Sequence, residues 1–315
     1  MNLFDRFAAA CLPLVPRFIV RRLSTRYIAG EQMDQALTTG KTLQQAGYQV
    51  TYDILGEAVD HREGVTAAAE EYHRLLEALV EQNLELNISL KPTQMGLEIT
   101  EGFCFETIAR IAEKAKKHGA FIRYEMEDSS TTDATLRVFQ QLRNSFGDTI
   151  GCVVQSMLRR TVQDCKDLVA SDLPLNVRLV KGIYVEPEPI AYQSTDDVNT
   201  AYLDSLRVLL EGGAFVGLAT HDPALIQGAR EIIRSIPGSE NRVEVQMLLG
   251  VQENLRNEVK RSGIPVRVYI PYGTQWYPYV TRRLKKNPRL ARYAMMGLFA
   301  PKEKLAPLSG QSSED

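Results

Sequence analysis

The chain has 315 residues, of which 44% are hydrophobic and 24% are charged, and its formal net charge is −2. This composition is ordinary for a globular protein whose length allows one large core, and it argues against a nucleic-acid-binding protein with a broad basic surface. The four cysteines form no CxxC pair and the four histidines are scattered, so neither a disulfide framework nor a metal site is predicted.

The N-terminal part, about residues 3–27 and 31–46, has two helical patterns. It contains the apolar patch FAAACLPLVPRFIV followed by arginines; a signal peptide has its positive charge before the apolar part. We interpret residues 1–46 as an amphipathic helical arm, with peripheral membrane contact as the minority alternative. No apolar run approaches the roughly 20 residues that span a bilayer. Residues 300–315 are small and polar and are predicted to be a disordered tail.

Between these ends, residues 47–299 alternate between strand and helix patterns. The expected strands are 48–54, 86–91, 120–126, 150–155, 175–180, 214–220, 243–248 and 266–270. The expected helices between them are 66–82, 101–118, 133–146, 161–170, 198–211, 223–236 and 252–262. The strands start about 23 to 39 residues apart, which is typical of βα units and not of hairpins. Eight such units predict an α/β protein with a (β/α)8 TIM-type barrel. A doubly wound open sheet is the alternative, but no GxGxxG motif follows the first strand.

Polar residues stand at the carboxyl ends of seven of the eight expected strands. They are Lys91, Glu125, Gln155, Arg178 with Lys181, Thr220 with His221, Gln246 and Tyr269. In a barrel these ends meet at one mouth, where the chemistry takes place. Because polar groups beside a barrel core must be paired, so many of them in one place indicate a site.

The last strand leads into a stretch, YIPYGTQWYPYVTRR, with five aromatic residues and two adjacent arginines. After Gly273 the pattern is that of a short helix that ends in Arg282 and Arg283. Arginine binds a carboxylate through a planar fork, and aromatic rings exclude the water that weakens such a pair. This stretch therefore predicts a clamp for an anionic ligand, and the alternative is a solvated basic helix end.

Three kinds of function fit these residues. Lys91 or Lys181 could form a Schiff base in a lyase, since lysine at a strand end suits that chemistry. Alternatively, Arg178 and Lys181 could stabilise a reduced flavin, while Gly182 lets the backbone approach the cofactor closely. A non-catalytic barrel that binds a small carboxylate is the third alternative. The spacing of the residues leaves all three open.

The chain also resembles a known family, FAD-dependent proline dehydrogenase, in its compact single-function bacterial form. Seven segments carry the resemblance in order: ISLKPTQMG, IRYEMEDS, VVQSMLRRT, RLVKGIY, LATHD, VEVQMLLG and VRVYIPYGTQWYPYVTRR. They lie within residues 10–298, and the family has a distorted (β/α)8 barrel. The resemblance implies oxidation of L-proline to Δ1-pyrroline-5-carboxylate by hydride transfer to FAD. Electrons then pass to a quinone, and the expected location is the cytoplasm.

The resemblance also assigns roles to residues. It implies that proline is bound by Lys91, Tyr184, Leu248, Tyr269, Tyr279, Arg282 and Arg283. It implies that FAD is contacted by Met126, Gln155, Arg178, Lys181, Gly182, Ile183, Thr220 and His221. It implies catalytic roles for Glu125 and Arg178, and no metal.

Three positions depart from the family pattern. Glu125 stands where the family usually has aspartate, Ile183 where alanine is common, and Lys286 where glutamate is frequent. The first lengthens a carboxylate by one methylene, the second adds bulk near the cofactor, and the third removes an expected counter-ion of the clamp. These departures bear on the preference for proline.

Overall fold

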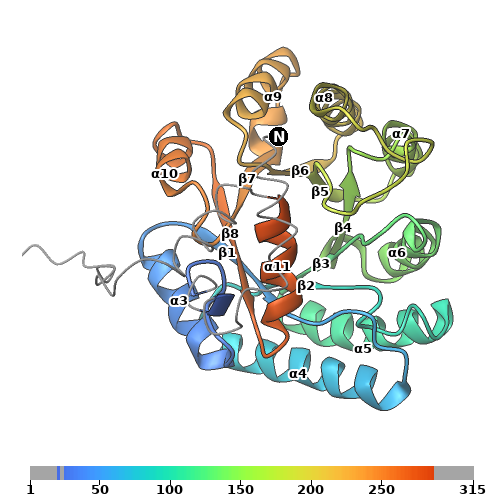
Figure 1. The fold of residues 1–315 in the computed structure, drawn as a ribbon, viewed down its shortest axis with the longest axis vertical. Coiled ribbons are helices and arrows are strands. Elements are labelled where there is room, and N and C mark those ends of the chain that lie inside the picture. The colour runs from blue at the N-terminus through green and yellow to red at the C-terminus, as the bar shows by residue number, and fades with distance from the viewer. Residues whose placement is uncertain (1–19, 22–24, 287–315) are drawn as a thin grey trace, which may run out of the picture. The chain divides into compact units, whose positions relative to one another are not determined.

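In the computed structural model, which describes residues 20–21 and 25–286, eight parallel strands form a closed barrel (Figure 1). The strands follow one another around the barrel in sequence order, and β8 pairs with β1 to close it. The chain divides into two compact units, Arg26–Thr274 with the barrel, and Met1–Thr25 with Gln275–Asp315.

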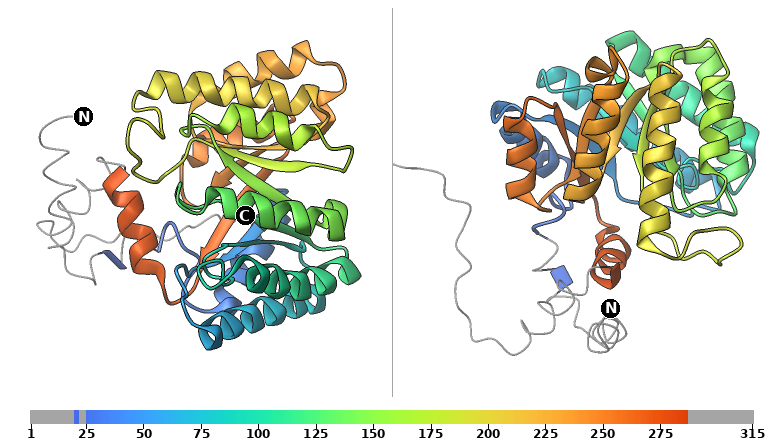
Figure 2. Two further views of the ribbon diagram at one scale, coloured as in Figure 1. Left: turned by 90° about the vertical axis from the view of Figure 1, so that its right-hand side faces the viewer. Right: turned by 90° about the horizontal axis from the view of Figure 1, so that it is seen from above.

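The strands are short and mostly buried, as expected for a barrel surrounded by helices. They are β1 Gln49–Ile54, β2 Asn87–Leu90, β3 Phe121–Tyr124, β4 Ile150–Gln155, β5 Asn176–Val180, β6 Phe215–Ala219, β7 Val243–Leu248 and β8 Val266–Tyr272. The helices of the barrel unit are α3 Met33–Gln45, α4 Arg62–Glu81, α5 Glu101–His118, α6 Thr132–Phe146, α7 Thr161–Val169, α8 Thr195–Glu211, α9 Pro223–Ser235 and α10 Glu253–Arg261. Figure 2 shows these helices on the outside of the strands.

The predicted fold class is confirmed, since each of the eight expected strands is present and the sheet closes. The alternative of an open, doubly wound sheet is wrong. The last strand is longer than predicted, because β8 continues through Pro271 to Tyr272. The Pro271 carbonyl accepts a hydrogen bond from the Ala29 backbone at 2.9 Å, and the Tyr272 carbonyl accepts one from Leu55 at 2.7 Å. Proline lacks an N–H but keeps its carbonyl, so the extension is compatible with its chemistry.

Side-chain caps fix where several helices begin. Thr100 caps α5 by accepting from the Phe103 backbone at 3.1 Å, and Asp222 caps α9 by accepting from Ala224 at 3.0 Å. Helix α8 begins three residues earlier than expected, at Thr195, because Ser194 accepts from the Asp197 backbone at 3.0 Å. Such caps set the points at which the loops at the barrel mouth return to the outer helices.

Helix α3, expected at about 31–46, is confirmed and packs against β1 and β8. Gly40 on this helix lies against the barrel, where a Cβ atom would come within 1.9 Å of the Tyr52 hydroxyl. The close approach therefore requires glycine. The helix expected at about 3–27 and the tail at 300–315 lie mostly or wholly outside the described residues, and the predicted domain boundaries stay a prediction.

The other unit contains α11, Trp276–Lys286, which confirms the short helix expected after Gly273. At its start the Trp276 and Tyr277 rings meet edge to face, with centroids 5.7 Å apart. The Thr281 hydroxyl donates to the Tyr277 carbonyl at 2.8 Å, one turn back along the helix.

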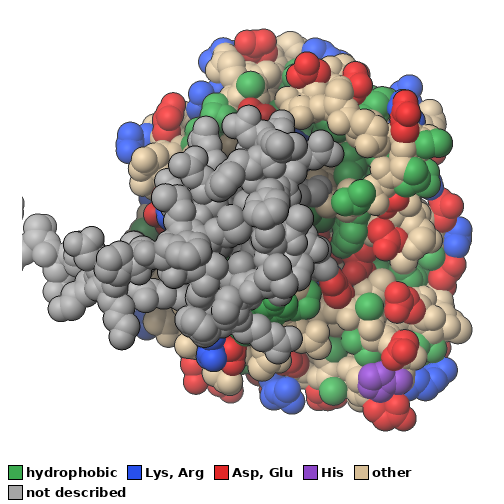
Figure 3. All heavy atoms as spheres, in the orientation of Figure 1, with side chains coloured by type: hydrophobic (Ala, Val, Ile, Leu, Met, Phe, Trp, Pro, Cys, Tyr) green, Lys and Arg blue, Asp and Glu red, His purple; other side chains and the backbone are tan. Residues whose placement is uncertain are grey.

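Among the described residues, no helix is both long and apolar enough to cross a membrane. On the face shown in Figure 3, acidic and basic side chains alternate around the rim of the molecule.

Candidate active site

Arg178 is the centre of a network at the carboxyl ends of the strands. It lies on β5 and is 4% exposed. Its guanidinium donates to Gln246 Oε1 at 2.5 Å and to Ser89 Oγ at 3.1 Å, and it forms an ion pair with Glu125. The same group lies over the Tyr269 ring, 5.2 Å from the centroid. Four side chains, from β2, β7, β8 and the position after β3, thus fix one cation in the barrel interior.

A second network contains Lys91, which follows β2. Its ammonium group donates to both oxygens of Asp53, at 2.7 and 2.9 Å, and Asp53 also accepts a hydrogen bond from the Tyr269 side chain. Burial alone would lower the pKa of Lys91, but the carboxylates of Asp53, Glu125 and Glu127 raise it above its ordinary value. Lys91 is therefore a fixed positive charge.

The loops around Lys91 are held by Glu127, which is 5% exposed. Its carboxylate accepts from the Thr93 backbone and the Thr93 hydroxyl, both at 2.8 Å. Gln155 donates to the Glu127 carbonyl at 2.7 Å, so its amide nitrogen pairs with buried backbone. Met126, between Glu125 and Glu127, is 7% exposed.

The ends of β5 to β7 carry the remaining cofactor candidates. The Lys181 ammonium pairs with Asp222 at 2.7 Å, and Thr220 accepts from the Asp222 backbone at 3.1 Å. The Leu248 backbone donates to His221 Nε2 at 2.9 Å, so this ring nitrogen carries no proton. The N-cap of α9 is Asp222.

Gly182 has a left-handed backbone with φ of 108°. This conformation favours glycine, and a Cβ atom there would lie 2.4 Å from the Met157 sulfur and would displace that side chain. Ile183 and Tyr184 follow and are half-buried, and Tyr184 packs against Met157, Leu158 and Ala191.

The remaining candidates are on α11. Tyr279 lies within this helix, and so do the backbones of Arg282, Arg283 and Lys286, whose side chains are outside the described part of the structure. Because α11 belongs to the other compact unit, the predicted clamp stays a prediction.

Sequence reasoning missed three residues of these networks: Asp53, Ser89 and Glu127. Asp53 is on β1, the one strand for which no polar end residue was predicted, and it is fully buried. An aspartate within a strand is unusual, and this was the signal that could have identified it.

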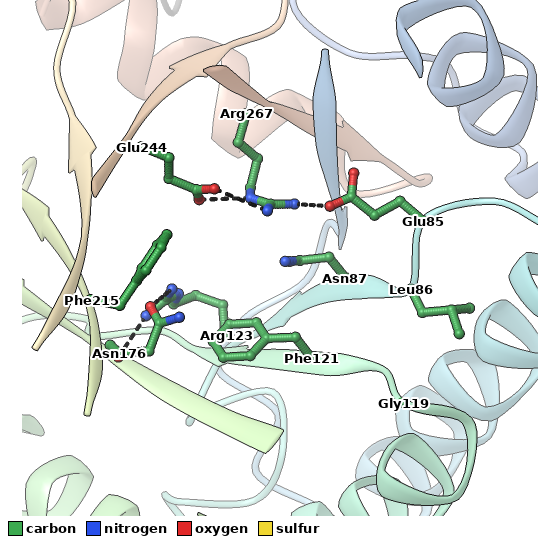
Figure 4. A pocket seen from close by; sticks show the side chains of 10 residues that line it. All are labelled: Glu85, Leu86, Asn87, Gly119, Phe121, Arg123, Asn176, Phe215, Glu244 and Arg267. Carbon is green, nitrogen blue, oxygen red and sulfur yellow. Dashed lines mark hydrogen bonds and ion pairs between the residues drawn. The ribbon is translucent and has the colours of Figure 1, made fainter. Parts of the chain in front are cut away.

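At the opposite, amino end of the barrel, a cavity of about 440 Å³ is also lined by charged side chains (Figure 4). Arg267 donates to both oxygens of Glu244, at 2.7 and 3.0 Å, and to Glu85 at 2.5 Å. Arg123 donates to the Asn176 side chain at 2.5 Å and to the Cys152 carbonyl at 2.8 Å. These side chains pair with one another or with the backbone. We therefore assign the amino end of the barrel a role in stability.

We predict that Arg267→Met destabilises the protein by about 3–5 kcal/mol, because it leaves Glu244 buried without its cation. Arg137→Met is the control, since its ion pair with Glu101 is exposed and contributes little to stability. Denaturant unfolding of both variants measures the difference. Equal losses in the two variants would contradict the assignment.

The fold and the mouth define a class, a (β/α)8-barrel protein with two fixed cations and an aromatic ring at the carboxyl ends of its strands. The sequence profile of the family described as proline dehydrogenase matches residues 36–292. The chain belongs to this family.

Individual relatives agree. The proline dehydrogenase of Deinococcus radiodurans is 34% identical over 281 residues, which cover 88% of this chain and 90% of the relative. Proline dehydrogenase 1 of Bacillus subtilis is 31% identical, with 87% and 90% covered. The similar lengths of these proteins fit the compact single-function form.

A solved structure of proline utilization A from Bdellovibrio bacteriovorus, inactivated by N-propargylglycine, has the same fold. The TM-score is 0.80 at 23% identity, and the match covers 90% of this chain and 34% of the larger protein.

Proposed function

We propose that this protein is a flavoenzyme that oxidises L-proline to Δ1-pyrroline-5-carboxylate with FAD as cofactor and a quinone as electron acceptor. Membership of the proline dehydrogenase family supports an oxidoreductase that acts on proline. The observation that carries the proposal is the pair of fixed cations, Arg178 and Lys91, which both contact the same aromatic-lined end of the barrel.

The cation Arg178 and the polar groups near it suit the binding of FAD. When bound, the flavin would supply a hydride acceptor for C5 of proline, and the proline nitrogen would lose a proton as the bond between C5 and nitrogen becomes double. A reduced flavin is electron-rich and is stabilised by a nearby cation. Arg178 is such a cation, and four partners fix its guanidinium, so little reorganisation is needed during the reaction. Met126, Gln155, Lys181, Gly182, Ile183, Thr220 and His221 would hold the rest of the cofactor.

The substrate would bind next to Lys91. Its ammonium group would attract the proline carboxylate together with Arg282 and Arg283, and Tyr184, Leu248, Tyr269 and Tyr279 would surround the ring. Glu125, in its ion pair with Arg178, would orient the guanidinium. Its extra methylene relative to aspartate gives it reach toward that group.

The Schiff-base lyase has no support. A nucleophilic lysine must be neutral, whereas Lys91 has a raised pKa and Lys181 forms an ion pair with Asp222. Borohydride added with the substrate should therefore trap no adduct on either lysine.

Incubating the purified protein with proline and a soluble quinone tests the function. We expect a product two mass units lighter than proline and an equal amount of reduced quinone. Proline that stays unchanged while the protein carries its flavin would contradict the proposal.

We predict that FAD is held without a covalent bond, because no residue stands out as an attachment point. Denaturation followed by filtration should then move all of the flavin into the filtrate. Flavin that stays on the unfolded chain would show the prediction to be wrong.

We also propose that the enzyme works in the cytoplasm, that residues 1–46 form a helical arm and that residues 47–299 form the catalytic barrel. Peripheral contact of this arm with the membrane that holds the quinone stays the minority alternative.

A further inference from the structure

Asp53 is fully buried, yet its side chain contacts two of the proposed substrate-binding residues. Both of its oxygens accept from Lys91, at 2.7 and 2.9 Å, and the Tyr269 side chain also hydrogen-bonds to it. These partners come from β1, β2 and β8, which are neighbours in the closed sheet. The carboxylate of β1 therefore links groups from the strands on both sides of it.

The contact with Tyr269 connects Asp53 with the other network. The Tyr269 ring lies under the Arg178 guanidinium, and Arg178 pairs with Glu125. A shift of the tyrosine would thus affect both the wall of the substrate site and the cation proposed for the flavin. Asp53 lies beneath these groups and is 0% exposed, so it acts through them and not on the substrate.

We propose that Asp53 is a positioning residue, which rests on the proposed function: it fixes the Lys91 ammonium group and the Tyr269 ring for the carboxylate and ring of the substrate. Lys91 has three rotatable donors and a flexible stem, so on its own it would not hold one direction. Two hydrogen bonds to one buried carboxylate leave it one donor for a ligand. The charge and the direction of that donor then both depend on Asp53.

The test is a cycle of Asp53→Asn, Lys91→Met and the double variant, using the purified protein as isolated. Calorimetry measures the Kd of a five-membered ring carboxylate with oxygen in place of the amine nitrogen, which cannot be oxidised to an imine. We expect Asp53→Asn to raise this Kd roughly 10-fold in the parent but less than about twofold in the Lys91→Met background. In turnover, Asp53→Asn should raise KM more than it lowers kcat.

A matched control is Asp164→Asn on α7, which removes a buried carboxylate that pairs with Arg160. It should leave the Kd unchanged. An equal loss from Asp53→Asn in both backgrounds would mean that Asp53 only supports the fold, and no loss would also overturn the inference. If the parent itself fails to bind the ring carboxylate, the result contradicts the proposed substrate, and it also overturns the inference that rests on it.

Stability gives a second measurement if Asp53→Asn folds poorly. Each single variant leaves a buried group without its partner, whereas the double variant removes both charges. The double variant should therefore unfold at higher denaturant than either single variant. A double variant less stable than both would contradict a direct pairing of Asp53 with Lys91.

Discussion

Replacing Arg178 with methionine is expected to slow flavin reduction by proline about 100- to 1,000-fold, because it removes a fixed charge that favours the reduced ring. The affinity for a non-oxidisable ring carboxylate should change far less, since that ligand is assigned to Lys91 and the clamp. Rapid mixing of the oxidised enzyme with proline measures the reduction rate, and a titration measures the affinity.

Arg178→Lys is the companion variant. It keeps the charge but loses the fork that reaches both Gln246 and Ser89. We expect it to retain more of the reduction rate than Arg178→Met does. Equal losses of rate and affinity in Arg178→Met would place Arg178 in the substrate site and not beside the flavin.

Arg283→Met is expected to weaken the binding of proline and of the inert ring carboxylate in parallel, by about 10- to 150-fold. This range corresponds to the roughly 1.5–3 kcal/mol of a hydrogen bond to a charged group. Because the clamp acts in both the ground state and the transition state, KM should change more than kcat. Arg283→Lys keeps the charge without the fork and should give a smaller but clear loss.

Lys285→Met on the same helix is the matched control, since Lys285 is interpreted as part of a solvated helix end. It should leave KM and flavin content as in the parent. If Arg283→Met also leaves both affinities unchanged, the result contradicts the clamp and favours the alternative, a solvated basic helix end.

The fold could be predicted from the sequence because each strand is a short run rich in β-branched residues, and the helices between them show apolar residues at helical spacing. The beginning of α8 and the end of β8 were missed for local reasons. Ser194 caps the helix three residues early, and Pro271 continues a strand in which its carbonyl is still used.

The site was predicted less completely, because the sequence alone does not show which side chains contact one another in the fold. Lys91 and Arg178 were identified from their places at strand ends. Asp53 was not, although it lies 38 residues from Lys91 and contacts it directly. That contact depends on the pairing of β1 with β2, whose register places Asp53 opposite Ser89, two residues before Lys91. Gly182 was predicted to admit the cofactor, whereas the structure explains it by its positive φ and by Met157.

The visible spectrum of the purified protein, recorded before and after addition of L-proline without oxygen, tests the central claim most directly. A bound flavin that proline reduces gives a yellow protein whose colour bleaches on addition. D-proline in the same concentration is the control for the chiral site. A colourless protein, or a yellow one that proline does not bleach, would contradict the proposed function.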